Sequence, residues 1–374
     1  MRFPNSPGKG GLSRPGSSRP SLTHLTMRAM IDTPVVADCT ILCTILILHD
    51  VEAPVKFMEG RPRVLFFGMQ GSFSLPSLRA LLESGIEVCA VVIHGDQAQG
   101  FGSDQLPLYR REPVHQVRST LPVLNSSPES SIVQLAWQRK IPLWEVHRLS
   151  DPATVLTLTA YQPDVICVAC FSQRIPRAIL EIAPLGCLNV HPSMLPANRG
   201  PVPLFWTFRL GCKQTGVSIH FMDEGMDCGD ILAQEIIPVA DGMSYAQLEL
   251  ESARFGGNLL CHTIWELYER SAISLSQDEN KSSYHGFPDD EDFVVPIAEW
   301  DASHVYNFIC GVAEWGGPVT LSVGSEHLAV RKAISYSHNT MCDMPSENYC
   351  WRSEELWIRC KSGWVAVIQP ITFQ

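Results

Sequence analysis

From residue 63 onward, short apolar runs alternate with segments of helical spacing, and this alternation restricts the chain to few folds. Residues 63–67 form one apolar run, which ends at Gly68, and residues 87–93 form the next. Between these runs the leucines recur at helical spacing, at Leu75, Leu78, Leu81 and Leu82. A strand–helix–strand order builds a parallel sheet covered by helices. We therefore predict an α/β fold with a Rossmann-like parallel sheet.

The same rhythm continues through the middle of the chain. Residues 164–171 form a continuous apolar run, which is typical of a parallel strand buried on both faces. Ser244 and Gln247 form a capping box, which predicts the start of a long helix. Gly68 and Gly71 lack the third glycine of a dinucleotide fingerprint, so they are weak evidence for one. The remaining expected elements are helices at 132–139 and 153–160, and strands at 143–146, 188–191, 216–221 and 231–237.

Beyond residue 284 the pattern changes to one helix and several alternating strands. Asp301 is expected to cap the helix, and the strands are expected at 319–323, 327–334, 356–360 and 364–368. This content predicts a small C-terminal β-barrel similar to an OB fold. The predicted organisation is a catalytic domain over 58–270, a linker over 271–284 and the β-barrel domain over 285–374. Residues 1–57 are expected to be disordered or to precede the true start of the protein.

Composition excludes several classes of protein. The 374 residues suffice for two domains, and the net charge of −11 argues against general nucleic-acid binding. The apolar segment 39–48 is shorter than the roughly 20 residues of a membrane span, so no membrane association is expected. Cys167 and Cys170 form a CxxC inside an apolar run, which favours buried thiols over a metal site. We expect a cytoplasmic protein, and the sequence leaves its oligomeric state open.

The most informative polar residues lie in two segments. Asn189 and His191 are two apart on a predicted strand, so both point to the same face. They end that strand, and open α/β sheets bind ligands at the carboxyl ends of their strands. Asp227 lies in a glycine-punctuated loop between two later strands, from which it can reach the imidazole.

These three residues suit the transfer of a formyl group to an amine. Asn189 can donate a hydrogen bond to the oxyanion, and a charged His191 can stabilise the same oxygen while Asp227 orients the imidazole. The proton acceptor stays open between His191, Asp227 and a water molecule. No metal is expected, since His191 and His220 lack a third ligand. Taken singly each residue has a structural interpretation, and His220 in particular is expected to be a core or surface group.

The two segments resemble the folate-dependent formyltransferase family, which includes methionyl-tRNA formyltransferases. The resemblance rests on residues 189–196 (NVHPSMLP), on Arg199 and Gly200, and on residues 215–232 (TGVSIHFMDEGMDCGDIL). It extends from residue 63 to about residue 373. It implies that Asn189, His191 and Asp227 are the catalytic trio.

The resemblance also implies a donor and a site for it. The donor would be 10-formyltetrahydrofolate, with its pteridine beside the loop at 171–176 and with the loop at 223–227 closing the other side. Apolar walls with a few polar groups suit such a flat ligand. The residues implied to bind the donor are Phe171, Ser172, Gln173, Arg174, Ile175, Ser193, Leu195, Pro196, Asp223, Glu224 and Gly225.

The acceptor amine is less constrained than the donor. The two-domain layout resembles members that formylate initiator Met-tRNA, and we rank this acceptor first. Residues 285–374, however, contain five Lys or Arg residues against twelve Asp or Glu residues, which is unfavourable for a phosphate backbone. An amino sugar or another small amine is therefore the alternative acceptor, and a non-catalytic folate-binding protein is the alternative of a different class.

Overall fold

The computed structural model describes residues 60–95, 106–113, 131–339, 348–352, 354–368 and 371–372. All of them belong to one compact unit, Lys56–Gln374. The predicted extension at 1–57 lies outside the described residues. Most of the polar stretch at 95–131 also lies outside them.

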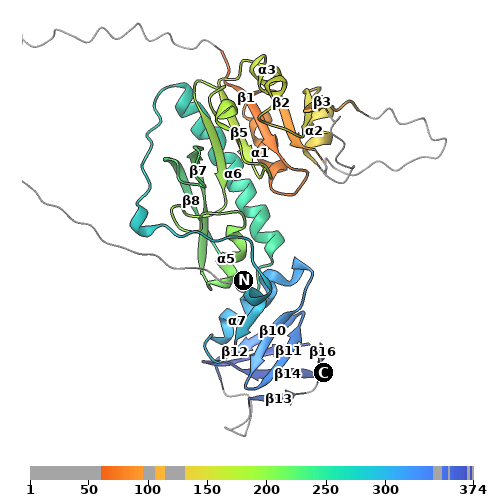
Figure 1. Ribbon diagram of the computed structural model, residues 1–374. Helices are drawn as coiled ribbons and strands as arrows, with labels where there is room; N and C mark the ends of the chain where they lie inside the picture. Colours follow the sequence, from red (N-terminus) through yellow and green to blue (C-terminus); the bar gives the residue numbers. More distant parts are fainter. Residues whose placement is uncertain are drawn as a thin grey trace, which may run out of the picture. The chain divides into compact units, whose positions relative to one another are not determined.

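The centre of the N-terminal part is an eight-stranded sheet of order β3-β4-β2-β1-β5-β6-β7-β8 (Figure 1). The five strands from β4 to β6 pair in parallel, whereas β3, β7 and β8 pair antiparallel. This arrangement confirms the Rossmann-like prediction and adds an antiparallel strand pair at one side. The strands are β1 Arg63–Gly68, β2 Glu87–His94, β3 Leu108–Arg110, β4 Leu143–Val146, β5 Val165–Ala169, β6 Cys187–His191, β7 Gln214–Phe221 and β8 Ile231–Pro238.

Helices cover this sheet, and a glycine lets the longest of them pack closely against it. The capping box of Ser244 and Gln247 starts α6, Tyr245–Tyr268. A Cβ atom on Gly256 would lie 2.5 Å from Val190 Cγ1, so the absent side chain lets α6 approach β6. No helix among the described residues has the length and apolarity to span a membrane. The other helices here are α1 Ser74–Glu83, α2 Ile132–Gln138, α3 Pro152–Thr159, α4 Arg177–Leu180 and α5 Pro203–Arg209.

The described residues of the C-terminal part form a small β structure with the α-helix α7 Ala302–Val312 and two 3-10 helices, η2 Asp290–Phe293 and η3 Ala313–Trp315. Its strands form two four-stranded sheets, β16-β11-β10-β9 and β12-β15-β14-β13. These sheets agree with the β structure that the sequence predicts for this part, and they belong to the same compact unit as the N-terminal part. The strands are β9 Val294–Pro296, β10 Val319–Val323, β11 Glu326–Val330, β12 Ala333–Ser337, β13 Tyr349–Arg352, β14 Glu355–Arg359, β15 Trp364–Val367 and β16 Ile371–Thr372.

Two local predictions for this part were wrong. The single strand expected at 327–334 is two strands, because the chain leaves one sheet at Val330, which pairs with Val319, and enters the other at Ala333, which pairs with Val367. Asp301 precedes α7 but makes no side-chain capping bond. Its carboxylate instead accepts a hydrogen bond from Ser362 Oγ at 2.6 Å.

The segment expected as a linker, 271–284, lies against the N-terminal part. Leu275 forms an isolated bridge with Ile231 at the start of β8, and Tyr284 forms another with Arg199. A short 3-10 helix, η1 Glu279–Lys281, lies between these two bridges. The segment is therefore attached to the loops that follow β6 and β7, in addition to connecting two parts of the chain.

Candidate active site

The last strand of the parallel set presents two polar side chains on one face. Within β6, Asn189 is half-buried and His191 is buried. The neighbouring strand β7 runs antiparallel to β6, and this register places His220 directly opposite Asn189. Directly opposed residues lie close enough for their side chains to interact. The site thus contains a second histidine, which the sequence pattern had assigned to the core or the surface.

Hydrogen bonds fix the tautomer of His220. Its Nδ1 lies 2.8 Å from the carbonyl oxygen of Phe221, so Nδ1 carries the proton and donates it. The Nε2 atom is then an acceptor, and it lies 3.2 Å from Asn189 Nδ2, which donates to it. Burial first, and the nearby charge of His191 second, lower the pKa of His220 from 6.5 to about 4. His220 is therefore a neutral acceptor at physiological pH, and it orients the Asn189 amide.

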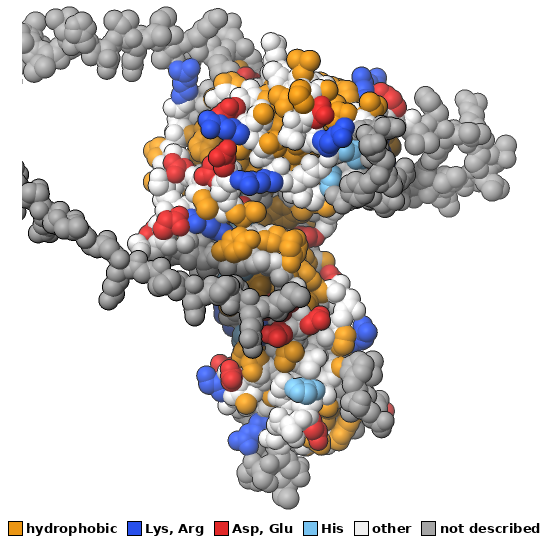
Figure 2. Space-filling view, in the orientation of Figure 1, with side chains coloured by type: hydrophobic (Ala, Val, Ile, Leu, Met, Phe, Trp, Pro, Cys, Tyr) orange, Lys and Arg blue, Asp and Glu red, His pale blue; other side chains and the backbone are white. Residues whose placement is uncertain are grey.

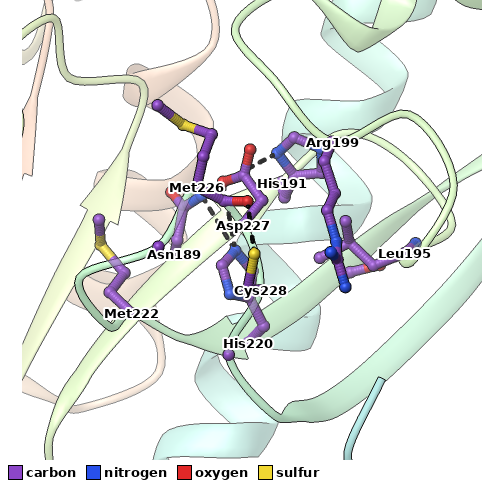
Figure 3. A network of polar contacts seen from close by, with 12 residues as sticks. Asn189, His191, Leu195, Arg199, His220, Met222, Met226, Asp227 and Cys228 are labelled. Carbon is purple, nitrogen blue, oxygen red and sulfur yellow. Dashed lines mark hydrogen bonds and ion pairs between the residues drawn. The ribbon is translucent and has the colours of Figure 1, made fainter. Parts of the chain in front are cut away.

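His191 is oriented from both sides of its ring. Its Nε2 donates to the carbonyl oxygen of Asn198 at 3.0 Å, because a carbonyl can only accept. Its Nδ1 faces Asp227, whose Oδ1 lies 3.7 Å away. The same carboxylate oxygen lies 3.7 Å from His220 Nε2. In Figure 3 the side chains of Asn189, His191, His220 and Asp227 point toward one another.

The backbone around Asp227 holds its carboxylate in place. Asp227 has a φ of 54°, which lies in the left-handed region of backbone conformation that residues other than glycine adopt less readily. Its Oδ2 accepts a hydrogen bond from the backbone N–H of Gly200 at 2.8 Å. Gly200 has a φ of 116°, and a Cβ atom there would lie 2.0 Å from the carbonyl oxygen of His285. Only glycine fits this position, which brings the N–H to the carboxylate.

The loop after β5 and the loop after β7 meet beside this centre. Arg174 donates from Nη2 to the carbonyl oxygen of Glu224 at 2.5 Å. Both residues line a cavity of about 500 Å³. The sequence placed Gln173, Arg174, Ile175 and Glu224 at the donor site, and all four line this cavity. Its other lining residues are His147, Arg148, Leu149, Ser150, Pro176 and Arg177.

The lining residues after β4 were not among the predicted ones. His147 to Ser150 follow the carboxyl end of the parallel strand β4. Residues that follow such a strand commonly line ligand sites in α/β sheets, so their place in the sequence could have indicated this role. Phe171 and Ser172 do not line the cavity. The Phe171 ring packs edge-on against Phe67 at 5.2 Å, and Ser172 Oγ lies 2.6 Å from His94 Nδ1.

Five other predicted donor-binding residues have contacts that shape loops. Ser193 is buried and donates to the carbonyl oxygen of Ala197. Leu195 is buried, its backbone N–H donates to Ser218 Oγ, and its bond to Pro196 is cis. Asp223 accepts a hydrogen bond from the N–H of Gly225, which forms a tight turn. None of the five lines the cavity near Arg174.

The guanidinium of Arg199 is bound by side chains of the segment 271–284. It donates to Gln277 Oε1 and forms a two-pronged pair with Glu279, at 3.0 and 2.8 Å. Arg199 is therefore held in an internal salt bridge.

Metal ligands and reactive thiols do not gather elsewhere in the described part of the chain. Within residues 60–95, 106–113, 131–339 and the described C-terminal strands, no three His, Cys, Asp or Glu side chains are grouped as a metal site requires. Cys167 is buried, Cys170 is exposed, and both are free thiols. Burial raises the pKa of the Cys167 thiol, which keeps it protonated.

Comparison with known proteins identifies related sequences. Residues 62–264 match the family model described as formyl transferase. The chain is 33% identical to the methionyl-tRNA formyltransferase of Syntrophus aciditrophicus over 261 aligned residues. The aligned region covers 70% of this chain and 76% of that protein. It is 28% identical over 302 residues to the methionyl-tRNA formyltransferase of Pelobacter propionicus, which covers 80% and 85%.

Comparison with solved structures shows the same fold. The sugar 3N-formyl transferase WlaRD superposes with a TM-score of 0.54 at 16% identity, over 84% of this chain and all of that one. The N-formyltransferase of Helicobacter canadensis superposes with a TM-score of 0.52 at 16% identity, over 82% of this chain and 99% of that one. At this identity the likeness concerns the fold alone.

Proposed function

The chain belongs to the formyl transferase family, and on that premise we propose that it moves the formyl group of 10-formyltetrahydrofolate to a primary amine at Asn189, His191 and Asp227. As a family member most similar to methionyl-tRNA formyltransferases, it is a formyltransferase. The observation that carries the assignment of residues is their convergence. Asp227, 36 positions beyond His191 in the sequence, lies with its Oδ1 3.7 Å from His191 Nδ1.

The geometry supports a direct attack of the amine on the formyl carbon. The amine nitrogen forms a bond to that carbon, and the carbonyl oxygen becomes an oxyanion. Asn189 Nδ2 carries two hydrogens, of which one is donated to His220, so the other is available to the oxyanion. Such a donor, fixed before the reaction starts, stabilises the developing charge without reorganising.

His191 and Asp227 are suited to move the protons. His191 Nε2 is occupied by the Asn198 carbonyl, which leaves Nδ1 as the nitrogen that exchanges a proton. The 3.7 Å between Nδ1 and Asp227 Oδ1 exceeds a hydrogen bond, so the amine or a water molecule can contact both atoms. The attacking amine loses a proton there. The bond from the formyl carbon to N10 then breaks, and N10 takes up a proton as the folate leaves.

The donor's site is proposed to be the hollow between the loops after β5 and β7. Its volume of about 500 Å³ is within the range of small-molecule sites. Arg148, Arg174 and Arg177 line it, and arginines favour the carboxylates that a folate carries at its glutamate end. The pteridine would then extend from this cavity toward Asn189.

Two acceptors remain candidates. The names of the relatives favour Met-tRNA. The charge of the C-terminal part favours a small amine. Its described residues from 285 onward include five basic and ten acidic side chains. On the face drawn in Figure 2, the basic side chains of this part are scattered among acidic ones. A phosphate backbone is held chiefly by clustered Lys and Arg.

Formyl-labelled 10-formyltetrahydrofolate separates these candidates. The protein is incubated with the labelled donor and either Met-tRNA or an amino sugar, and the label on each amine is counted. Label on the methionyl amine supports the first acceptor. Label on the sugar amine alone shows that the acceptor is a small amine and not Met-tRNA. Label on neither amine, nor on other primary amines, contradicts the proposed function.

A further inference from the structure

The segment 271–284 makes more polar contacts with the catalytic loops than a connector requires. The Gln277 side chain uses both ends of its amide there. Its Nε2 donates to the carbonyl oxygens of Asp227 and Gly229, at 2.8 and 2.7 Å. Its Oε1 accepts from Arg199 Nε and Nη2, at 3.1 and 2.8 Å. All of these partners belong to the two loops that carry or flank the proposed catalytic residues.

These contacts close a ring around Asp227. The carboxylate of Asp227 accepts a hydrogen bond from the N–H of Gly200. The adjacent residue, Arg199, donates to the side chain of Gln277. Gln277 in turn donates to the backbone carbonyl oxygen of Asp227. Glu279 holds Arg199 from its other side. Arg199 is only 6% exposed, so water does not readily replace a partner that its guanidinium loses.

The same segment supports the other side of the centre. Ser283 Oγ accepts a hydrogen bond from the backbone N–H of Asn198 at 2.8 Å. The carbonyl oxygen of Asn198 is the acceptor that fixes the tautomer of His191. The backbone N–H of Arg199 also donates to the carbonyl oxygen of Ser283 at 2.8 Å. Both loops therefore depend on one segment, although that segment contributes no side chain to the reacting atoms.

We infer that Gln277 is a positioning residue for the formyl transfer, and that the segment 271–284 acts as a strap that holds Asp227 at its distance from His191. The expected effect of Gln277 on kcat rests on the proposed function. Asp227 has a left-handed backbone, so it needs external bonds to persist. Gln277 supplies one hydrogen bond to the carbonyl oxygen of Asp227 and another to that of Gly229.

The variant Gln277→Glu tests this inference with a minimal change of shape. A glutamate keeps an oxygen for Arg199 but loses both N–H donors to the carbonyl oxygens of Asp227 and Gly229. We expect kcat to fall about 10- to 100-fold, the effect typical of a reactive group misplaced by roughly 1 Å. The KM for the folate should change less than about twofold, since Gln277 does not line the donor cavity. Lys281→Ala is the matched control, because Lys281 lies on the strap and pairs with exposed Asp278.

Amide hydrogen exchange separates the strap from the enzymatic assignment. In Gln277→Glu, the N–H of Gly200 should exchange at least about tenfold faster than in the wild type, because its acceptor carboxylate moves. An unchanged kcat together with unchanged Gly200 exchange overturns the inference. If the wild type formylates no amine, the proposed function fails, and the exchange measurement still decides whether the strap holds the loop.

A second variant covers the case in which Gln277→Glu does not fold. Glu279→Ala alters a side chain that is 69% exposed and releases Arg199 from one side. A fall in kcat of several-fold with an unchanged melting temperature supports the strap. An unchanged kcat overturns it.

Discussion

Replacing His220 by glutamine is expected to remove a specific pH dependence of stability. His220 is 1% exposed, and its pKa is lowered from 6.5 to about 4, chiefly by burial and next by His191. Glutamine does not titrate, and its side-chain oxygen can still accept the hydrogen bond from Asn189. The variant therefore isolates the titration of one buried imidazole from the loss of a packing contact.

The sign and size of the effect follow from the two pKa values. Above pH 6.5 His220 is neutral in both the folded and the unfolded chain, so its titration contributes nothing. As the pH falls from 6.5 toward 4, the unfolded chain binds a proton that the folded chain does not, and the folded state loses stability. One pKa unit corresponds to about 1.4 kcal/mol. The loss is thus about 2 kcal/mol at pH 5 and about 3 kcal/mol at pH 4, where it levels off.

Urea unfolding followed by tryptophan fluorescence measures this difference. The free energy of unfolding of His220→Gln, relative to the wild type, should rise by about 2 kcal/mol between pH 7.5 and pH 5. His262→Gln, at an exposed position of α6, serves as the control and should show no such change. A difference between His220→Gln and the wild type that stays within about 0.5 kcal/mol across this range would refute a neutral, buried His220.

Three further predictions concern the donor and the packing. His191→Ala should abolish turnover while the folate dissociation constant, measured by calorimetry, stays within about threefold; lost folate binding would contradict its assigned role. Arg174→Ala should weaken folate binding about tenfold in the same assay, because a lining guanidinium is removed, and unchanged affinity would move the donor elsewhere. Gly256→Ala should destabilise the protein by about 1–3 kcal/mol in urea unfolding, since its Cβ would lie 2.5 Å from Val190 Cγ1; an unaffected midpoint would mean that α6 shifts freely.

The order of elements in the catalytic part could be predicted from the sequence because it depends on local patterns. The apolar run at Val165–Ala169 is a buried strand, and the capping box at Ser244 starts α6 as predicted. The strand at Leu143–Val146 has the predicted limits. Periodicity and capping depend only on neighbours within a few residues, and so the sequence displays them directly.

Features that depend on pairing between distant residues could not be predicted in this way. The division of 327–334 into β11 and β12 follows from which strands each half pairs with, and alternation looks the same in either sheet. The residues after β4 line the cavity because β4 and β5 end at the same edge of one sheet. Donor-binding roles for Ser193 and Leu195 remain predictions, and the structure shows them bonded within their own loop and to Ser218.

By itself, the sequence determined that Asn189 and His191 share a face at the end of a strand, because residues two apart on a strand always do. It also determined that Asp227 lies in a turn between two strands. Only the tertiary structure decided that His220 faces Asn189, through the antiparallel register of β6 and β7. It alone brought Gln277 to the carbonyl oxygen of Asp227, 50 residues away. Side-chain type and local spacing state what a residue can do, whereas the packing of distant segments decides which partner it meets.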